Sequence, residues 1–76
     1  MTEQEIKTEY LKSRREQFIR DICGNEMNIA YLKTKDGKDS VGSNVAEDEI
    51  KKAREYIEES KKKLKFIDSL IEKNAI

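Results

Sequence analysis

The chain has 76 residues, of which 36% are hydrophobic and 42% charged, and its 16 basic and 16 acidic side chains give a formal net charge of zero. This length allows one small domain, residues 1–76, with a marginal core, and the balanced charge excludes a global field that would attract nucleic acid or an anionic membrane. The single cysteine, Cys23, excludes an internal disulfide. Without an apolar run typical of a signal peptide or a membrane span, the sequence predicts a cytoplasmic protein with no membrane partner.

The first predicted element is a helix over residues 3–23. Thr2 and Glu5 have the spacing of a capping box, in which each side chain bonds the backbone N–H of the other residue. Gly24 follows the last apolar position, where a glycine commonly ends a helix. Between these ends, apolar residues recur at spacings close to three and four, as in an amphipathic helix: Ile6, Tyr10, Leu11, Phe18, Ile19 and Ile22.

The middle segment, residues 24–44, predicts a short β-hairpin that pairs residues 29–35 with residues 38–42. Ile29, Tyr31 and Thr34 favour strands, and Asp36-Gly37 is a strong signal for a two-residue hairpin turn. An irregular loop over residues 27–43 is the alternative that the sequence leaves open.

The second predicted helix spans residues 45–74, with Asn44 as its N-cap. Apolar positions here alternate by three and four without a break, which is the pattern of a heptad seam. The first set of seam positions is aliphatic and the second is small or polar toward both ends, so another helix could approach closely. The first set is Ile50, Ile57, Leu64 and Ile71; the second is Ala53, Ser60, Ile67 and Asn74.

No motif in the sequence predicts catalysis. Gly37 and Gly42 have the separation of a P-loop, but Ser43-Asn44 follows where that loop needs a lysine. The chain has no histidine, and Cys23 follows a predicted helix C-terminus, which disfavours a thiolate. We therefore expect no enzyme activity, catalytic residue, cofactor, metal or small-molecule substrate.

The predicted fold class is mainly α: a two-helix antiparallel hairpin with a short β-hairpin or loop at its tip, completing its core as a homodimeric four-helix bundle. Helices of 21 and 30 residues would differ in length by about 14 Å. The end of the longer helix would then overhang and form a partner-binding surface, made of Phe66, Ile67, Leu70 and Ile71.

Two functions are compatible with this fold. The first is a protein-protein interaction module that sterically regulates or inhibits a larger protein; 12 lysines against 4 arginines favour an AT-rich bacterial or phage genome as its source. The alternative is a dimeric nucleic-acid-binding regulator, because lysines cluster in the second helix and decorate the middle segment. Its candidate residues are Tyr31, Lys33, Lys35, Lys38, Lys61, Lys62, Lys63 and Lys65.

Overall fold

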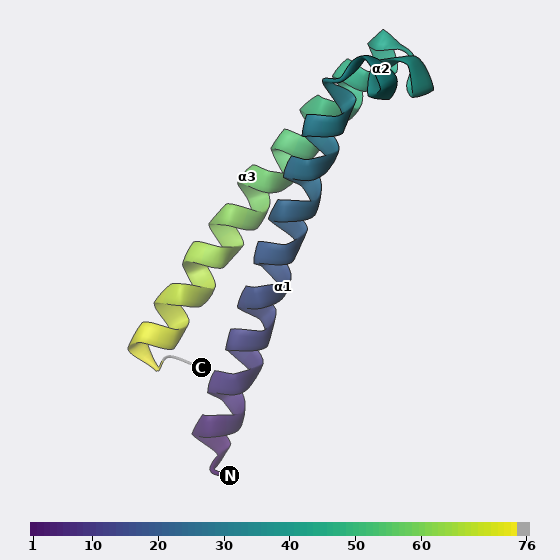
Figure 1. The fold of residues 1–76 in the computed structure, drawn as a ribbon. Helices are drawn as coiled ribbons and strands as arrows, with labels where there is room; N and C mark the ends of the chain where they lie inside the picture. The colour runs from purple at the N-terminus through teal and green to yellow at the C-terminus, as the bar shows by residue number, and fades with distance from the viewer. Residues whose placement is uncertain (75–76) are drawn as a thin grey trace.

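Two long helices packed side by side form the molecule, and a short third helix closes the turn between them (Figure 1). The computed structural model describes residues 1–74. Its helices are α1 (Glu3–Leu32), α2 (Lys35–Val41) and α3 (Ser43–Lys73), and α1 runs antiparallel to α3. The hairpin measures 53 × 19 × 12 Å between its outermost Cα positions. The predicted antiparallel helical hairpin is therefore confirmed.

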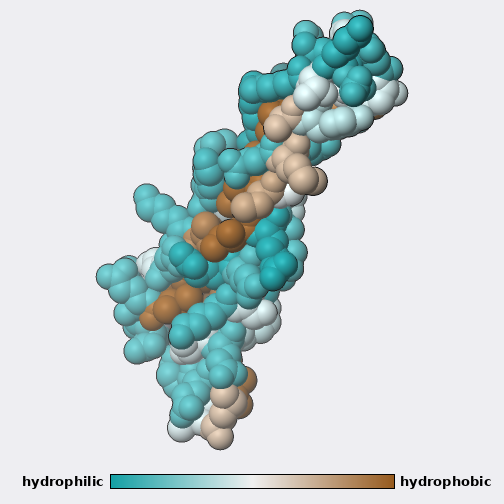
Figure 2. Space-filling model, in the orientation of Figure 1, coloured by the Kyte–Doolittle hydropathy of each residue, from teal (hydrophilic) through white to brown (hydrophobic). Residues whose placement is uncertain are grey.

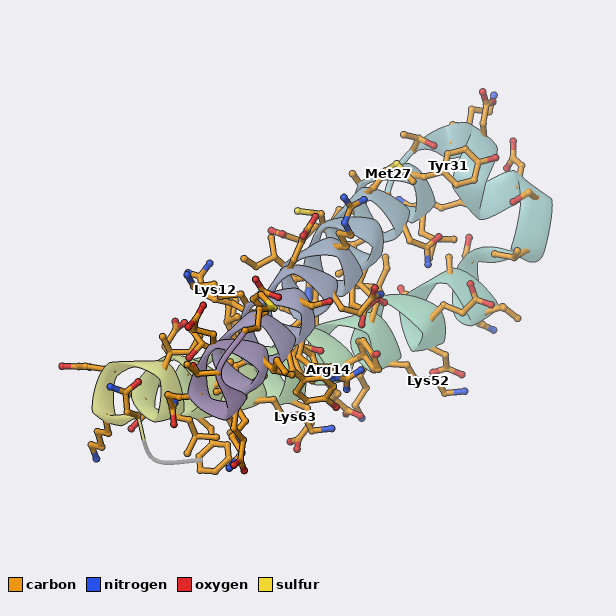
Figure 3. All side chains as sticks on the ribbon, turned by 90° about the horizontal axis from the view of Figure 1, so that it is seen from below. Lys12, Arg14, Met27, Tyr31, Lys52 and Lys63 are labelled. Carbon is orange, nitrogen blue, oxygen red and sulfur yellow. The ribbon has the colours of Figure 1, made fainter. Side chains whose placement is uncertain are left out.

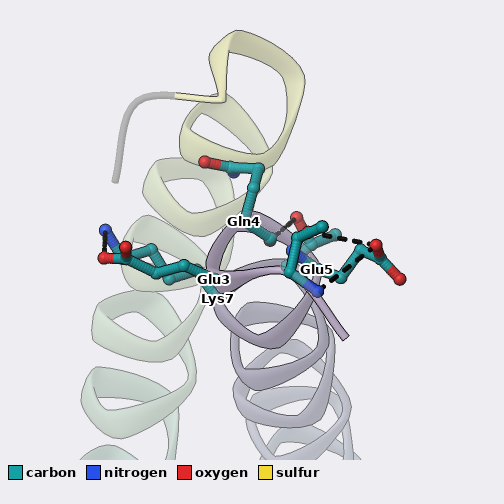
Figure 4. Close-up of polar contacts among 6 residues, drawn as sticks. Glu3, Gln4, Glu5 and Lys7 are labelled. Carbon is teal, nitrogen blue, oxygen red and sulfur yellow. Dashed lines mark hydrogen bonds and ion pairs between the residues drawn. The ribbon is translucent and has the colours of Figure 1, made fainter.

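The start of α1 is fixed by the predicted capping box (Figure 4). The backbone N–H of Glu5 donates to the hydroxyl of Thr2 at 3.2 Å, and the backbone N–H of Thr2 donates to the Glu5 carboxylate at 3.5 Å. One turn further, Lys7 pairs with Glu3 at 3.1 Å. The two capping-box bonds satisfy backbone N–H groups that have no partner within the helix.

Helix α1 does not end near Cys23, as the sequence predicts, but continues nine residues further to Leu32. A glycine inside a helix costs about 1 kcal/mol relative to alanine. Burial of Leu32 and partial burial of Ile29 outweigh this cost. The side chain of Asn25 also donates to the carbonyl of Asp21, one turn back, at 2.8 Å. Tertiary packing thus overrides the local stop signal.

The predicted β-hairpin is wrong, because none of residues 1–74 lies in a strand. Thr34 is instead the N-cap of α2, and its hydroxyl accepts from the backbone N–H of Gly37 at 3.0 Å. Gly37 is buried in the first turn of α2, where a Cβ would collide with the backbone carbonyl of Tyr31. The glycine of Asp36-Gly37 therefore allows α2 to approach the end of α1 closely, and it does not form a hairpin turn.

Gly42 makes the turn from α2 into α3 with a φ of 87°, in the left-handed region that favours glycine. α3 begins at Ser43, so the predicted N-cap Asn44 lies inside the helix, and it ends at Lys73 with Asn74 as a left-handed C-cap. The heptad seam of α3 is confirmed as the side that faces α1. Its buried positions are Ala53, Ile57, Ser60 and Ile67, and its half-buried positions are Ile50, Leu64 and Ile71.

Candidate protein-interaction groove

The two rows of seam positions on α3 differ in the size of their side chains. One row, Ile50, Ile57, Leu64 and Ile71, is entirely large and aliphatic. The other row, Ala53, Ser60, Ile67 and Asn74, is mostly small or polar. Small residues let two helices approach closely, so Ala53 and Ser60 are buried in spite of having only one helix against them. Three members of the large row remain half-buried, because a two-helix hairpin has no third layer to cover them.

Ile50, Ile57 and Ile71 of the large row line a groove along one face of the hairpin. Figure 2 shows apolar patches, in brown, in a row between the two helices, with hydrophilic teal side chains between some of them. A depression of about 590 Å³ lies over Ile29, Ala30 and Ile57. A second depression, of about 410 Å³, is lined by Ile50 and adjoins the first. A third depression, of about 400 Å³, lies over Ile19 and Ile71 near the open end of the hairpin. We call the surface made by these residues the groove: Ile19, Ile29, Ala30, Ile50, Ile57 and Ile71.

Charged side chains border the groove on both sides. Lys33, the C-cap residue of α1, and Arg54 of α3 line both depressions nearest the tip, with Glu58 and Lys61 beside them. Nearer the open end, Arg15 Nε and Asp68 Oδ1 form an ion pair at 2.6 Å that joins α1 to α3. Apolar floor between charged walls is the composition of a protein contact surface, where the centre is desolvated and the rim stays in water.

On the opposite face of the hairpin, charged side chains contact two aromatic residues, Phe18 and Tyr56, and Tyr56 remains 50% exposed. Phe18 is half-buried under two cations, with the Arg14 guanidinium 5.3 Å and the Lys63 amine 6.0 Å from the ring centroid. Further along, the Tyr56 hydroxyl donates to a carboxylate oxygen of Asp21 at 3.5 Å. In Figure 3, Arg14 and Lys63 lie on one side of the hairpin and Lys12, which lines the groove, lies on the other.

The four residues predicted to bind a partner do not share one surface. Phe66 is 64% exposed, Ile67 is buried at 8%, and Leu70 and Ile71 are half-buried. The overhang from which they were predicted is wrong, because α1 has 30 residues and α3 has 31. The helices end level, and Gln4 Nε2 lies 3.5 Å from Asn74 Oδ1. Of the four, only Ile71 belongs to the groove.

The residues of the nucleic-acid alternative are also spread over the molecule. Lys33 and Lys61 meet at the groove, whereas Lys63 covers Phe18 on the opposite face. Tyr31 lies beside Met27 on the outer side of α1, away from α3 (Figure 3). The remaining candidates are exposed on α2, Lys35 and Lys38, and on α3, Lys62 and Lys65. The structure gathers no single basic face from this set.

No helix within residues 1–74 combines the length and the apolar character needed to cross a membrane. The same residues contain no group of three or more histidine, cysteine, aspartate or glutamate side chains placed to hold a metal ion. Comparison of the chain with protein-family models, curated proteins and solved structures finds no match. The groove is therefore the feature from which a function can be argued.

Proposed function

We propose that the protein is a non-enzymatic interaction module that binds a larger protein through the groove and regulates or inhibits it by steric occlusion. The observation that carries this proposal is the row of aliphatic side chains that the hairpin leaves half-covered on one face. Large aliphatic side chains are left half-covered on one face, while Arg14 and Lys63 shield the aromatic ring of Phe18 on the other. A row of partly exposed apolar side chains on a small protein typically marks a contact surface.

The shape of the groove suits a helix from the partner. The α3 wall from Glu47 to Ile71 spans 24 residue steps, or about 36 Å at 1.5 Å per residue. An amphipathic helix laid into such a groove buries its apolar side and leaves its flanks against the charged rims. Three basic side chains, Lys51, Arg54 and Lys61, alternate along this wall with four acidic ones, Glu47, Glu55, Glu58 and Asp68. A wall of mixed and nearly balanced charge favours a partner helix that carries both signs of charge on its flanks.

The proposal also includes the finer expectations from the sequence. The protein would act in the cytoplasm, where the exposed free thiol of Cys23 stays reduced. Its source would be bacterial or a phage, and it would form the predicted homodimer. Such a dimer would use the groove face, where large aliphatic side chains are only half-buried.

Site-specific photo-crosslinking tests the proposal. A photoreactive amino acid replaces Ile19 in the groove, and in a matched variant it replaces Tyr10, which is on the same helix, is 60% exposed and does not line the groove. We expect position 19 to give an adduct with a second, larger protein and position 10 to give none. Adducts from position 10 alone would contradict the proposal. Adducts removed by nuclease would instead support the nucleic-acid alternative.

A further inference from the structure

The hairpin alone does not complete a core. Within residues 1–74, no large side chain falls below 2% relative exposure. Ile29, Ile50, Leu64 and Ile71 face the groove side of the seam and are only half-buried. A third and fourth helix over this face would bury the whole row, which is the arrangement of a four-helix bundle.

We propose that a second copy of this chain covers the groove in the free protein, with the two hairpins face to face and antiparallel, so that the tip of each lies over the open end of the other. This inference rests on the proposed function, in which the groove is a protein contact surface. It adds a mode of regulation: one groove holds one occupant, so the second copy has to dissociate before a larger partner binds.

The area of the face is sufficient for a stable dimer. A face 53 Å long and 19 Å wide has a projected area of roughly 1,000 Å². Each partner in an interface of standard size contributes about 800 Å². The formal net charge of zero means that two copies do not repel each other as they approach.

The overall charge along α3 favours the antiparallel arrangement. The side chains of α3 that line the groove itself are nearly neutral in both halves: Glu47, Lys51, Arg54, Glu55 and Glu58 in the first, Lys61 and Asp68 in the second. Residues 45–59 carry six acidic and three basic side chains, whereas residues 60–73 carry two acidic and five basic. When the tip of one hairpin lies over the open end of the other, α3 packs on α3 of the second copy with the acidic half opposite the basic half. With both tips together, α3 would pack on α1, whose first half, residues 3–17, has four acidic and four basic side chains and offers no such match.

Sedimentation equilibrium of the full chain tests the interface. Ile19→Lys places a charge in the groove at a position that is 36% exposed, so the lysine can reach solvent in the monomer. An isologous interface carries the substitution twice, and we expect the dissociation constant of the dimer to rise by about a hundredfold. Tyr10→Lys, outside the groove, should leave it unchanged. A wild-type protein that stays monomeric, or an Ile19→Lys variant that dimerises like the wild type, would overturn the inference.

Spin-label distances test the orientation. Asp39 is exposed on α2 at the tip and can be replaced by a labelled cysteine in a Cys23→Ser background. In the antiparallel dimer the two labels lie at opposite ends, at a distance on the order of the 53 Å length of the hairpin. Labels closer than about half that length would show that the tips lie together and would overturn the proposed orientation.

The two proposals fail in different ways. A monomeric protein that still crosslinks to another protein from position 19 would refute the second copy and support the proposed function. A dimer that is lost in Ile19→Lys, without any adduct to a larger protein, would support the second copy and contradict the proposed function.

Discussion

Replacing Gly24 with alanine should stabilise the protein, because the structure places this glycine in the middle of α1. A Cβ at position 24 would have no atom within 4 Å apart from its own helix and chain neighbours, so the methyl group meets no obstacle. Glycine is less favourable than alanine in a helix interior by about 0.5–1 kcal/mol, since it loses more conformational freedom on folding. We expect a gain of that size, which for a domain of this length raises the melting temperature by about 3–6 °C.

Gly37→Ala is the matched control, because it makes the same chemical change at a helical glycine that has no space. There the new methyl group would meet the backbone of Tyr31 and Leu32, so we expect a loss of about 2 kcal/mol or more. Urea unfolding followed by circular dichroism at 222 nm measures both changes. A loss of stability in Gly24→Ala would refute the reasoning, since it would mean that residue 24 ends the helix with a positive φ, as the sequence alone suggests.

The remaining predictions concern the turn, the cap and the ion pair. Gly42→Ala should cost about 1–2 kcal/mol in the same unfolding assay, because the φ of 87° is strained for any residue with a Cβ. Thr34→Val should cost about 1 kcal/mol and accelerate amide exchange at Gly37, whose N–H loses its acceptor; an unchanged exchange rate would contradict the cap. Asp68→Asn should change stability by less than about 1 kcal/mol, and less still at high salt, because the Arg15–Asp68 pair is half-exposed; a larger loss would contradict this estimate.

The long helices could be predicted from the sequence because their signals are periodic or involve neighbouring residues. The capping box of Thr2 and Glu5 depends on a spacing of three residues, and the seam of α3 repeats over four heptads. These patterns predict helices well because the residues that form the pattern also make the hydrogen bonds or packing contacts that stabilise the helix. The antiparallel packing follows from the amphipathic stripes that both helices have to bury.

The middle segment could not be predicted because its conformation depends on contacts with distant residues. Gly24 and Asp36-Gly37 are read locally as a helix stop and a hairpin turn. In the structure, burial of Leu32 accompanies the continuation of α1 past Gly24, and Gly37 is needed for a close approach to Tyr31. Both glycines are significant, but neither has the positive φ for which the sequence rules select glycine.

The overhang expected at the end of α3 followed from the helix stop expected at Gly24. A first helix of 21 residues would be shorter than its antiparallel partner and would leave Phe66 and Leu70 without a facing helix. With 30 residues, α1 is nearly as long as α3, so its N-terminal turns lie beside the last turns of α3. The signal for the groove was nevertheless present in the sequence, in the contrast between large aliphatic residues at one set of seam positions and small or polar ones at the other. That contrast predicts that the hairpin has one open face.

The most direct test of the groove as a protein-covered surface is paramagnetic broadening of isoleucine methyl signals by a soluble gadolinium chelate in the wild-type protein. Buried Ile67 and exposed Ile6 give the two limits within one sample. If the groove is covered, the methyl groups of Ile19, Ile50 and Ile71 should be protected nearly as well as that of Ile67. Broadening of these three signals to the extent that their exposure in the single chain allows would show a bare groove and contradict the account.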